Sequence, residues 1–579
     1  MSGSALCGID LLDGTKGKFG KSEKGTEMMK ERSLRTDVLI VGTGGAGLRA
    51  AIEAQKSGAE VMVVSKGGFP SGCTAVAMGG MLAAFDREDS TSRHFEDTVQ
   101  GGNHLNNRTL VRLLVDDAVE RTRDLEQYGT EFEKRDERYR LFPYTGSSVS
   151  RGVVALEPYR GGYIKGLVNE VRRLGVAVLE HVMITDLLKQ NDAIVGAAGL
   201  ELETDTFLIL HAKAVILATG GGGNLYHLTT NPPGITGDGY ALAYKVGAQL
   251  QDMEFVQGRV CMISPQKMRG IPPPGDGLVT LGGRFYNGLC ERYMRKYHPE
   301  KLELVTRAQM AICAQKEIQA GRGSPHGGVF GDLSGVPQEE LGTFKGFMEA
   351  CAAENFDPTW QPYEWAPGAH HFMGGVVINE RCETTVRGLY AAGEVAAGIH
   401  GANRLAGNAL TETQVFGAIA GKSAAKRALS PSRGSVSSSE IDSIRDRMVS
   451  ILTRGKGVDP LEVKDELAAI MSRYVGVLRN EDGLQRATQV LDEIKEKKIG
   501  NLRLAGERSF TALAGLLEVE NLLTVGRLVT LAATLRRETR GAHNREDYPE
   551  LDESWTKSIV LQLENEQITV TMRPIARTT

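Results

Sequence analysis

The chain has 579 residues, of which 24% are charged, and a formal net charge of -4 at pH 7. This length exceeds what one hydrophobic core usually organises, so we expect roughly two to four domains, and the interspersed charges argue against a nucleic-acid partner. Seven scattered cysteines form no Cys-x-x-Cys pair, which argues against an iron–sulfur, zinc or other metal site, and no apolar run is long enough to span a bilayer.

The first elements expected in chain order are a flexible extension and a βαβ unit. Residues 1–33 lack a hydrophobic period, so we expect no regular structure there. Apolar runs at 36–41 and 60–65 predict two buried strands, separated by a glycine turn at 42–47 and a helix at 48–57. Strands joined through a helix in this way are typical of nucleotide-binding domains.

The glycine turn reads Gly42-Thr-Gly-Gly-Ala-Gly47, a Gly-x-Gly-x-x-Gly pattern. Glycines let backbone amides approach a pyrophosphate, and the following helix N-terminus supplies partial positive charge, so the turn predicts dinucleotide binding. Its glycines are Gly42, Gly44, Gly45 and Gly47. The second strand ends in Ser65 and Lys66 instead of the acid that an NAD ribose favours, which makes FAD the preferred dinucleotide.

Two further strands also run into glycine turns. We expect them within 213–223 and 388–394, and the segment 236–239 opens an alanine-rich helix between them. Three such junctions, at 41, 218 and 391, suggest a discontinuous nucleotide domain with an insertion. In the last one Glu394 can accept hydrogen bonds from ribitol hydroxyls, and Arg404 is a fork-shaped donor suited to a carboxylate.

The other segments have distinct compositions. The insertion, 257–365, combines a proline-rich loop, amphipathic helices and a turn-rich stretch, which fits a mobile cap. After a serine-rich linker at 431–439 the pattern is helical from 441 to 537, and a strand-like run follows at 567–572.

Longer motifs follow one another in a fixed order. After the first turn they are Ala218-Thr-Gly-Gly221, Thr236-Gly-Asp-Gly239, Asp252-Met-Glu-Phe255, Glu291-Arg-Tyr-Met294, Gly374-Gly375, Gly393-Glu394, His400-Gly-Ala-Asn-Arg404 and Arg537-Glu-Thr-Arg-Gly-Ala-His543. In these motifs the chain, from Asp37 onward, resembles the flavoprotein subunits of succinate dehydrogenase and fumarate reductase, a family that also includes L-aspartate oxidase.

The resemblance implies an α/β fold in which a Rossmann-like FAD-binding domain is split by an α+β capping domain and followed by a helical domain and a small C-terminal domain. The ranges expected for these four are 34–256 with 366–430, 257–365, 431–540 and 541–579. Besides the glycines of the first turn, the residues expected around the flavin are Ser65, Lys66, Thr74, Gly79, Gly80, Ala218, Thr219, Gly220, Asp238, Glu394, Ala409 and Leu410.

Many members of the family carry a covalent bond from a histidine to the flavin. Counting back from Gly79 and Gly80, Cys73 stands in that place here. We therefore predict non-covalent FAD, with a cysteinyl thioether as the alternative.

The resemblance also assigns roles in the chemistry. In the family a hydride passes between flavin N5 and one alkene carbon while an arginine delivers a proton to the neighbouring carbon, and Arg307 matches that arginine. Because arginine is a very weak acid, this role needs a buried position and a proton chain behind it. His370 matches the substrate-binding histidine, with His371 in place of a tyrosine, and Arg404 would hold one carboxylate. The other expected substrate contacts are Thr280 and His400.

Several positions depart from the family pattern on one side of the pocket. A carboxylate-binding histidine is replaced by Arg259, a glutamate of the proton path by Leu281, and the aspartate after the catalytic arginine by Ala308. A Glu-Gly-Gly insertion expected after Arg284 is missing. Together these changes predict an altered substrate wall, with Arg259 facing an anionic ligand, a carboxylate or solvent.

Our leading hypothesis is the FAD-containing catalytic subunit of a fumarate reductase or succinate dehydrogenase-like complex. Because the chain lacks cluster ligands, it would exchange electrons with a separate iron–sulfur subunit. The alternatives are an enzyme for another anionic substrate, such as an aspartate oxidase, a thiol-coupled fumarate reductase or an adenylylsulfate reductase-like subunit, and an electron-relay subunit whose dicarboxylate chemistry has decayed. Without an apolar leader we expect a cytoplasmic location, with membrane contact only through partners.

Overall fold

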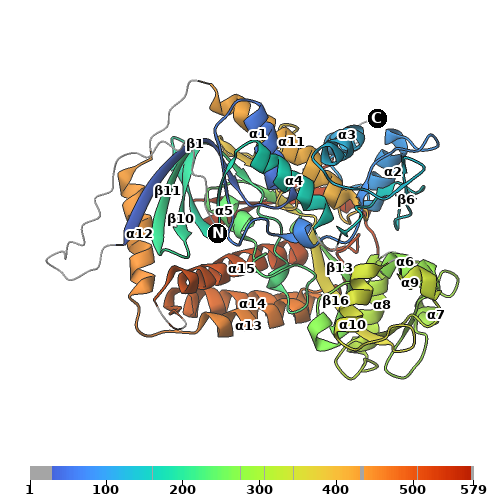
Figure 1. Cartoon of the computed structure of the whole chain (residues 1–579). Helices are drawn as coiled ribbons and strands as arrows, with labels where there is room; N and C mark the ends of the chain where they lie inside the picture. The colour runs from blue at the N-terminus through green and yellow to red at the C-terminus, as the bar shows by residue number, and fades with distance from the viewer. Residues whose placement is uncertain are drawn as a thin grey trace.

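The computed structural model describes residues 29–575, except 159–160, 274, 306, 343, 431–435, 505 and 507. Figure 1 shows a large α/β body and a smaller lobe beside it, joined through β13 (Val256–Ser264) and β16 (Tyr363–Phe372). Most of the predicted extension at 1–33 lies outside the described residues, as do Cys7 and part of the predicted linker at 431–439.

The main sheet forms the centre of the body. Among the described residues it has seven strands, in the order β8-β2-β1-β11-β10-β9 with β18 beside β11. These strands are β1 (Lys30–Val41), β2 (Val61–Val64), β8 (Ala177–Leu179), β9 (Val182–Gln190), β10 (Ala193–Glu201), β11 (Thr206–Leu217) and β18 (Leu389–Ala391). The first strand begins inside the predicted extension, because its residues from Lys30 pair in parallel with β11.

The predicted βαβ unit is present as β1, α1 (Gly45–Lys56) and β2. Residues Val38 to Val41 are buried, as expected for a strand covered on both faces. Helices α1, α4 (Gly162–Arg173) and α11 (Asn408–Ala428) cover one face of the sheet in Figure 1.

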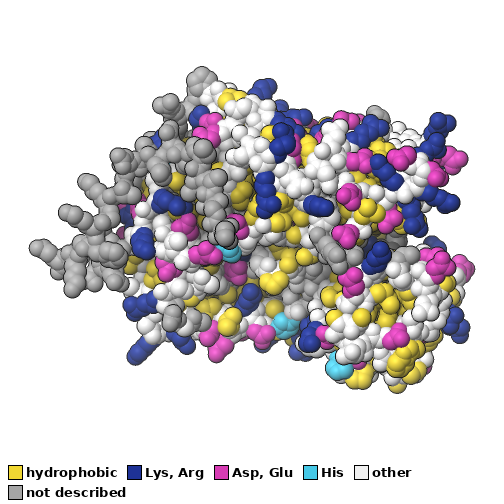
Figure 2. Space-filling view, viewed as in Figure 1, with side chains coloured by type: hydrophobic (Ala, Val, Ile, Leu, Met, Phe, Trp, Pro, Cys, Tyr) yellow, Lys and Arg dark blue, Asp and Glu magenta, His cyan; other side chains and the backbone are white. Residues whose placement is uncertain are grey.

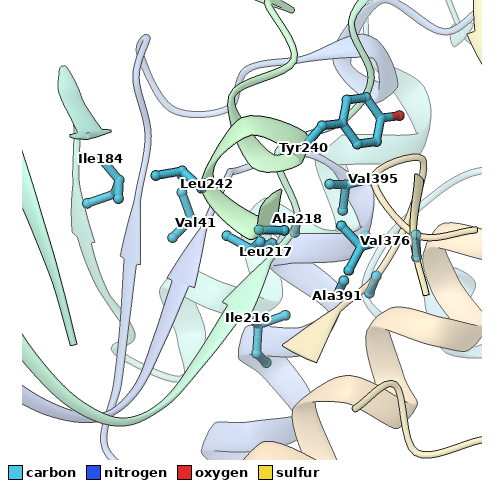
Figure 3. Close-up of a cluster of buried hydrophobic side chains, with 14 of the residues drawn as sticks. Val41, Ile184, Ile216, Leu217, Ala218, Tyr240, Leu242, Val376, Ala391 and Val395 are labelled. Atoms are coloured by element: carbon cyan, nitrogen blue, oxygen red, sulfur yellow. The ribbon is translucent and has the colours of Figure 1, made fainter. Parts of the chain in front are cut away.

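The three strand-to-glycine junctions lie side by side. Strand β11 pairs in parallel with β1 on one side and with β18 on the other, so their carboxyl ends share one edge of the sheet. Figure 3 shows Val41, Leu217, Ala218 and Ala391 close together at these ends. Helix α5 (Asp238–Lys245) begins at the predicted 236–239 segment, and its Tyr240 packs against the same edge.

The smaller lobe has its own hydrophobic core, which includes Val260, Phe285 and Trp365. A four-stranded antiparallel sheet runs in the order β13-β16-β15-β14. Its other strands and its helices are β14 (Arg284–Tyr286), β15 (Val329–Asp332), α6 (Gly275–Thr280), α7 (Met294–Tyr297), α8 (Arg307–Gln319), α9 (Gln338–Gly342) and α10 (Lys345–Ala353). We call this lobe the cap. Its connecting strands extend beyond 257–365 at both ends, because β13 and β16 remain paired to Phe372.

The remaining elements flank the main sheet. They are β3 (Met81–Leu82), α2 (Thr91–Gly101), α3 (Arg108–Gln127), β4 (Lys134–Arg135), β5 (Arg138–Tyr139), β6 (Leu141–Phe142), β7 (Gly152–Val153), β12 (Leu250–Gln251), β17 (Gly375–Val376), α12 (Ser438–Leu452), α13 (Pro460–Tyr474), α14 (Glu481–Lys497), α15 (Phe510–Leu535), β19 (Lys557–Glu564) and β20 (Gln567–Pro574). The predicted helical stretch and the strand at 567–572 are therefore present. In the described part of the chain no helix combines the length and apolarity that a membrane span needs, and Figure 2 shows acidic and basic side chains intermixed on the face in view.

A buried ionic cluster ties the C-terminal region to the body. Arg536, at the end of α15, is fully buried and forms ion pairs with Glu254 and Glu538. It also donates hydrogen bonds to the main-chain oxygens of Trp555 and Lys557, at 3.0 and 2.9 Å. Replacing it strands two carboxylates in the interior, which is more costly than losing an exposed pair.

We expect Arg536→Met to destabilise the FAD-loaded protein by about 3–5 kcal/mol, because Glu254 and Glu538 lose their buried partner. The matched control is Arg381→Met, which breaks an exposed pair with Glu383 and should cost at most about 1 kcal/mol. Thermal unfolding measures both. Equal falls in the two midpoints would contradict this expectation.

Candidate functional site

The first glycine turn is packed tightly at both ends and open in the middle. A Cβ on Gly42 would lie 2.3 Å from the Ala218 oxygen, and one on Gly47 would lie 2.0 Å from the Gly42 oxygen. A Cβ on Gly45 would meet side chains of Thr413 and Thr74 at 2.9 and 3.0 Å. At Gly44, by contrast, the nearest atom is 3.9 Å away. The turn therefore leaves space for a phosphate group beside the N-terminus of α1.

Hydroxyl groups hold the turn in this shape. The Thr43 Oγ1 lies 2.9 Å from Ser65 Oγ and 3.0 Å from Ser71 Oγ. Thr74 Oγ1 accepts a hydrogen bond from the Gly45 amide at 3.1 Å. The structure thus brings predicted residues Ser65 and Thr74 to the turn, together with Thr43 and Ser71, which sequence reasoning missed.

Lys66 links the end of β2 to the start of α5. Its Nζ donates to Thr236 Oγ1, Asp238 Oδ2 and Glu518 Oε1, each at 2.7 Å. Burial alone would lower the pKa of Lys66, but the carboxylates of Asp238 and Glu518 outweigh it and raise that pKa. Two predicted residues, Lys66 and Asp238, therefore meet. Glu518, from α15, had no local sequence signal.

The other predicted flavin residues lie at the ends of neighbouring elements. Gly79 and Gly80 precede β3, residues 218–220 follow β11, and Ala409 and Leu410 begin α11. The Thr219 hydroxyl is buried and has no hydrogen-bond partner among the described residues. Glycine turns that need the absence of a side chain, together with this unsatisfied hydroxyl, fit a bound dinucleotide.

Cys73 belongs to the short 3-10 helix Cys73–Val76 near this edge. Burial and the carboxylate of Glu394 both raise the pKa of its thiol. The protonated thiol is a poor nucleophile.

Glu394 follows β18 and is held as a carboxylate. It accepts a hydrogen bond from the Phe372 amide at 2.9 Å and lies 3.4 Å from His371 Nδ1. Burial would raise its pKa, but His371, the Phe372 amide and Arg404 together lower it. The main-chain oxygen of Glu394 accepts from the Tyr240 hydroxyl at 2.9 Å.

Three arginines and a histidine gather where the cap meets the body. Arg259 lies on β13, Arg307 begins α8, His370 lies on β16 and Arg404 lies in the loop before α11. Burial lowers the pKa of His370 far below its usual value, and Arg259, Arg404 and Arg307 lower it further. Burial and Arg307 lower the pKa of Arg404 to about 9. Such a concentration of positive charge favours an anionic ligand.

Gln257 positions Arg404. The Arg404 guanidinium donates to Gln257 Oε1 at 3.1 Å, and Gln257 Nε2 donates to Asn403 Oδ1 and to the Arg404 oxygen at 2.8 and 3.0 Å. The buried Arg404 Nε has no partner among the described residues, which leaves a donor for a carboxylate. Sequence reasoning missed Gln257, although it follows the motif at 252–255.

His370 is fixed from behind by the body. Thr230 Oγ1 lies 2.7 Å from His370 Nδ1, and Asn231 Nδ2 donates to the His370 oxygen at 3.1 Å. With a neutral ring, the Thr230 hydroxyl donates to Nδ1 and the proton resides on Nε2. His370 thus offers an N–H donor to a ligand.

Two other predicted substrate contacts lie differently. Thr280 ends α6 on the cap with an exposed side chain, and the next residue, Leu281, packs against the cap core. His400 is buried, with Nε2 2.9 Å from Glu412 Oε2. The substrate roles of Thr280 and His400 remain predictions.

The comparisons with known families agree with this geometry. Residues 37–410 match the FAD binding domain family, and residues 464–579 match the fumarate reductase flavoprotein C-terminal domain. The chain belongs to the fumarate reductase and succinate dehydrogenase flavoprotein family. This flavoprotein therefore binds FAD and is an FAD-dependent oxidoreductase acting on CH–CH groups.

Similar proteins match along nearly the whole flavoprotein. A subunit of the fumarate reductase (CoM/CoB) of Methanothermobacter marburgensis is 40% identical, covering 92% of this chain and 98% of the relative. L-aspartate oxidase of Streptomyces coelicolor is 33% identical, covering 92% of each. A solved E. coli quinol fumarate reductase flavoprotein, in a point-mutant form, superposes with a TM-score of 0.89 at 28% identity, covering 94% of this chain and 98% of that one.

A pair of glycine substitutions tests the first turn of the flavoprotein. Gly44→Ala should leave the thermal stability of the apoprotein unchanged, because its Cβ has space, but weaken FAD binding at least about tenfold, or about 1.4 kcal/mol. Gly47→Ala should destabilise the apoprotein itself by about 1–3 kcal/mol through contact with the Gly42 oxygen. Fluorescence titration with FAD and thermal unfolding measure the two effects. Unchanged FAD affinity in Gly44→Ala would contradict the proposed phosphate position.

Proposed function

We propose that this flavoprotein interconverts a C4 dicarboxylate and its alkene, as the FAD-containing catalytic subunit of a fumarate reductase or succinate dehydrogenase-like complex. The observation that carries the proposal is the gathering of Arg259, Arg307 and Arg404 around a neutral His370. A dicarboxylate brings two negative charges to this position and accepts hydrogen bonds from guanidinium groups at both ends.

The residues of the body hold the substrate. Arg404, oriented by Gln257, is placed to bind one carboxylate, and His370 offers its Nε2 proton to the substrate. Arg259 adds a further cation at the position where the family pattern has a histidine. When a hydride adds to an unsaturated carboxylate, negative charge grows on the carboxylate side, and fixed cations there stabilise the transition state.

The cap supplies the proton. Bound FAD provides the two-electron hydride chemistry. In fumarate reduction one alkene carbon accepts the hydride and its neighbour accepts a proton, so two electrons and two protons convert fumarate to succinate. Arg307 is the proposed donor of the second proton, since it faces His370 and Arg404 from α8. The proton path behind it does not use residue 281, because leucine cannot carry a proton.

We further propose that FAD is bound without a covalent link. The raised pKa of the Cys73 thiol keeps it protonated and therefore disfavours a cysteinyl thioether. Denaturation with acid should release all the flavin into solution.

For electron exchange we propose a separate iron–sulfur subunit. The relative from Methanothermobacter is named as one subunit of a CoM/CoB fumarate reductase, which favours the thiol-coupled alternative, in which a thiol pair donates the electrons and fumarate accepts them. Such a subunit would be cytoplasmic and reach a membrane only through its partners.

Charge separates this proposal from an aspartate oxidase. L-aspartate carries an ammonium group, which three neighbouring arginines repel. The ordered contacts of Gln257 with Arg404 and of Thr230 with His370 also argue against a decayed site. Purified FAD-loaded protein should therefore show flavin bleaching with succinate or reoxidation with fumarate, and little response to L-aspartate. Absence of any dicarboxylate response would refute the proposed function.

Arg307→Lys tests the proton donor. It keeps the positive charge but loses the guanidinium geometry, so we expect reoxidation of the reduced flavin by fumarate to slow by about 10²–10⁴-fold. Fumarate affinity, read from the flavin absorption spectrum, should change little. The control is Arg295→Lys on the exposed face of α7, which should leave the rate unchanged. A wild-type rate in Arg307→Lys would exclude Arg307 as the donor.

A further inference from the structure

A buried chain of polar side chains lies behind the proposed substrate position. His371, His400 and Glu412 are 5%, 3% and 1% exposed. They come from β16, from the loop before α11 and from α11 itself, and the chain ends on Glu394. The resemblance to known families puts a tyrosine at the place of His371, so this histidine pair is a property of the present chain.

The hydrogen bonds of this chain leave a gap between the two rings. His400 Nε2 lies 2.9 Å from Glu412 Oε2, and His371 Nδ1 lies 3.4 Å from Glu394 Oε2. The other ring nitrogens, His371 Nε2 and His400 Nδ1, are buried without partners among the described residues. The ring centres are 5.2 Å apart, and a ring nitrogen of each lies within 4.8 Å of the other and of a Glu412 oxygen.

Counting protons shows what the gap lacks. A neutral His400 donates Nε2–H to Glu412, and a neutral His371 donates Nδ1–H to Glu394, so each ring keeps one unsatisfied lone pair in the interior. One added proton on His371 Nε2 turns this into a donor facing the acceptor His400 Nδ1. A single proton therefore satisfies both buried nitrogens.

Ligand binding changes the proton affinity of these rings. The charged and titratable groups that face His371 are Glu394, His370, His400, Glu412 and Arg404. A bound dianion adds negative charge beside them, which favours protonation of an imidazole. His370 is the poorer acceptor, since three arginines act on it and Thr230 already satisfies its Nδ1. His371 has both a carboxylate partner and a free nitrogen.

We propose that His371 takes up one proton from solvent when a dicarboxylate binds, and shares it with His400. The new bond is N–H at His371 Nε2, and the buffer loses the proton. His371 is a positioning residue in this proposal: its charge holds Glu394 on one side while His400 and Glu412 hold the ring on the other. The inference rests on the proposed dicarboxylate function.

Calorimetry of fumarate binding to the oxidised, FAD-loaded protein tests the proposal, because the oxidised flavin cannot reduce fumarate. Titrations at pH 7.5 in phosphate and in Tris, which differ in ionisation enthalpy, give the number of protons taken up. We expect a value near one for the wild type and near zero for His371→Tyr, a residue that the family tolerates at this place. The control His326→Tyr, at an exposed cap histidine paired with Glu364, should retain the wild-type value.

The pH dependence of affinity gives a second measurement. Where the free site is unprotonated, wild-type affinity for fumarate should fall by up to about tenfold per pH unit, whereas a His371→Phe variant should lose this dependence. Uptake of a full proton by both His371 variants would overturn the proposal and point to His370. A divalent metal found at one equivalent by elemental analysis, and lost in His371→Tyr, would also overturn it, because the metal would fill the gap. Failure of the wild type to bind any dicarboxylate would instead refute the proposed function.

Discussion

The parallel pairing of β11 with β1 and β18 is the constraint on which the site depends. It brings three chain segments, far apart in sequence, to one sheet edge, where each turns through glycine. That edge positions the amides of the first turn, the lysine network of Lys66 and the carboxylate of Glu394 on one line. An insertion between β11 and β18 costs this arrangement nothing, because both strands keep their partners.

Charge organises the second half of the site. Arg259 and His370 lie on the paired strands β13 and β16, Arg404 is held by Gln257 in the body, and Arg307 begins a cap helix. Each cation lowers the proton affinity of its neighbours, so the empty arrangement is electrostatically unfavourable. A dianionic ligand relieves that repulsion, which makes binding affinity and charge complementarity the same property here.

The sequence was informative where local pattern determines structure. The β1–α1–β2 unit, the three glycine junctions and the final strand follow from hydrophobic period and turn residues, and family motifs identified the residues of the cationic cluster. Contacts formed only by the tertiary fold were not predictable. Glu518 reaches Lys66 from 452 positions away, and Gln257, Thr230 and the His371–His400 pair gain meaning only through their neighbours in space. The start of β1 was missed because its pairing with β11, not its polar sequence, extends it to Lys30.

The separate core of the cap links catalysis to access. Because Val260, Phe285 and Trp365 belong to a core of the cap's own, the cap can turn on β13 and β16 without disturbing the body. Arg307 travels with it, whereas Arg404 stays behind. Opening the pocket for exchange of ligand therefore removes the proton source at the same moment, so that a reduced flavin exposed to bulk water has no acid beside it. The hinge thus acts as a safeguard against wasted reducing equivalents.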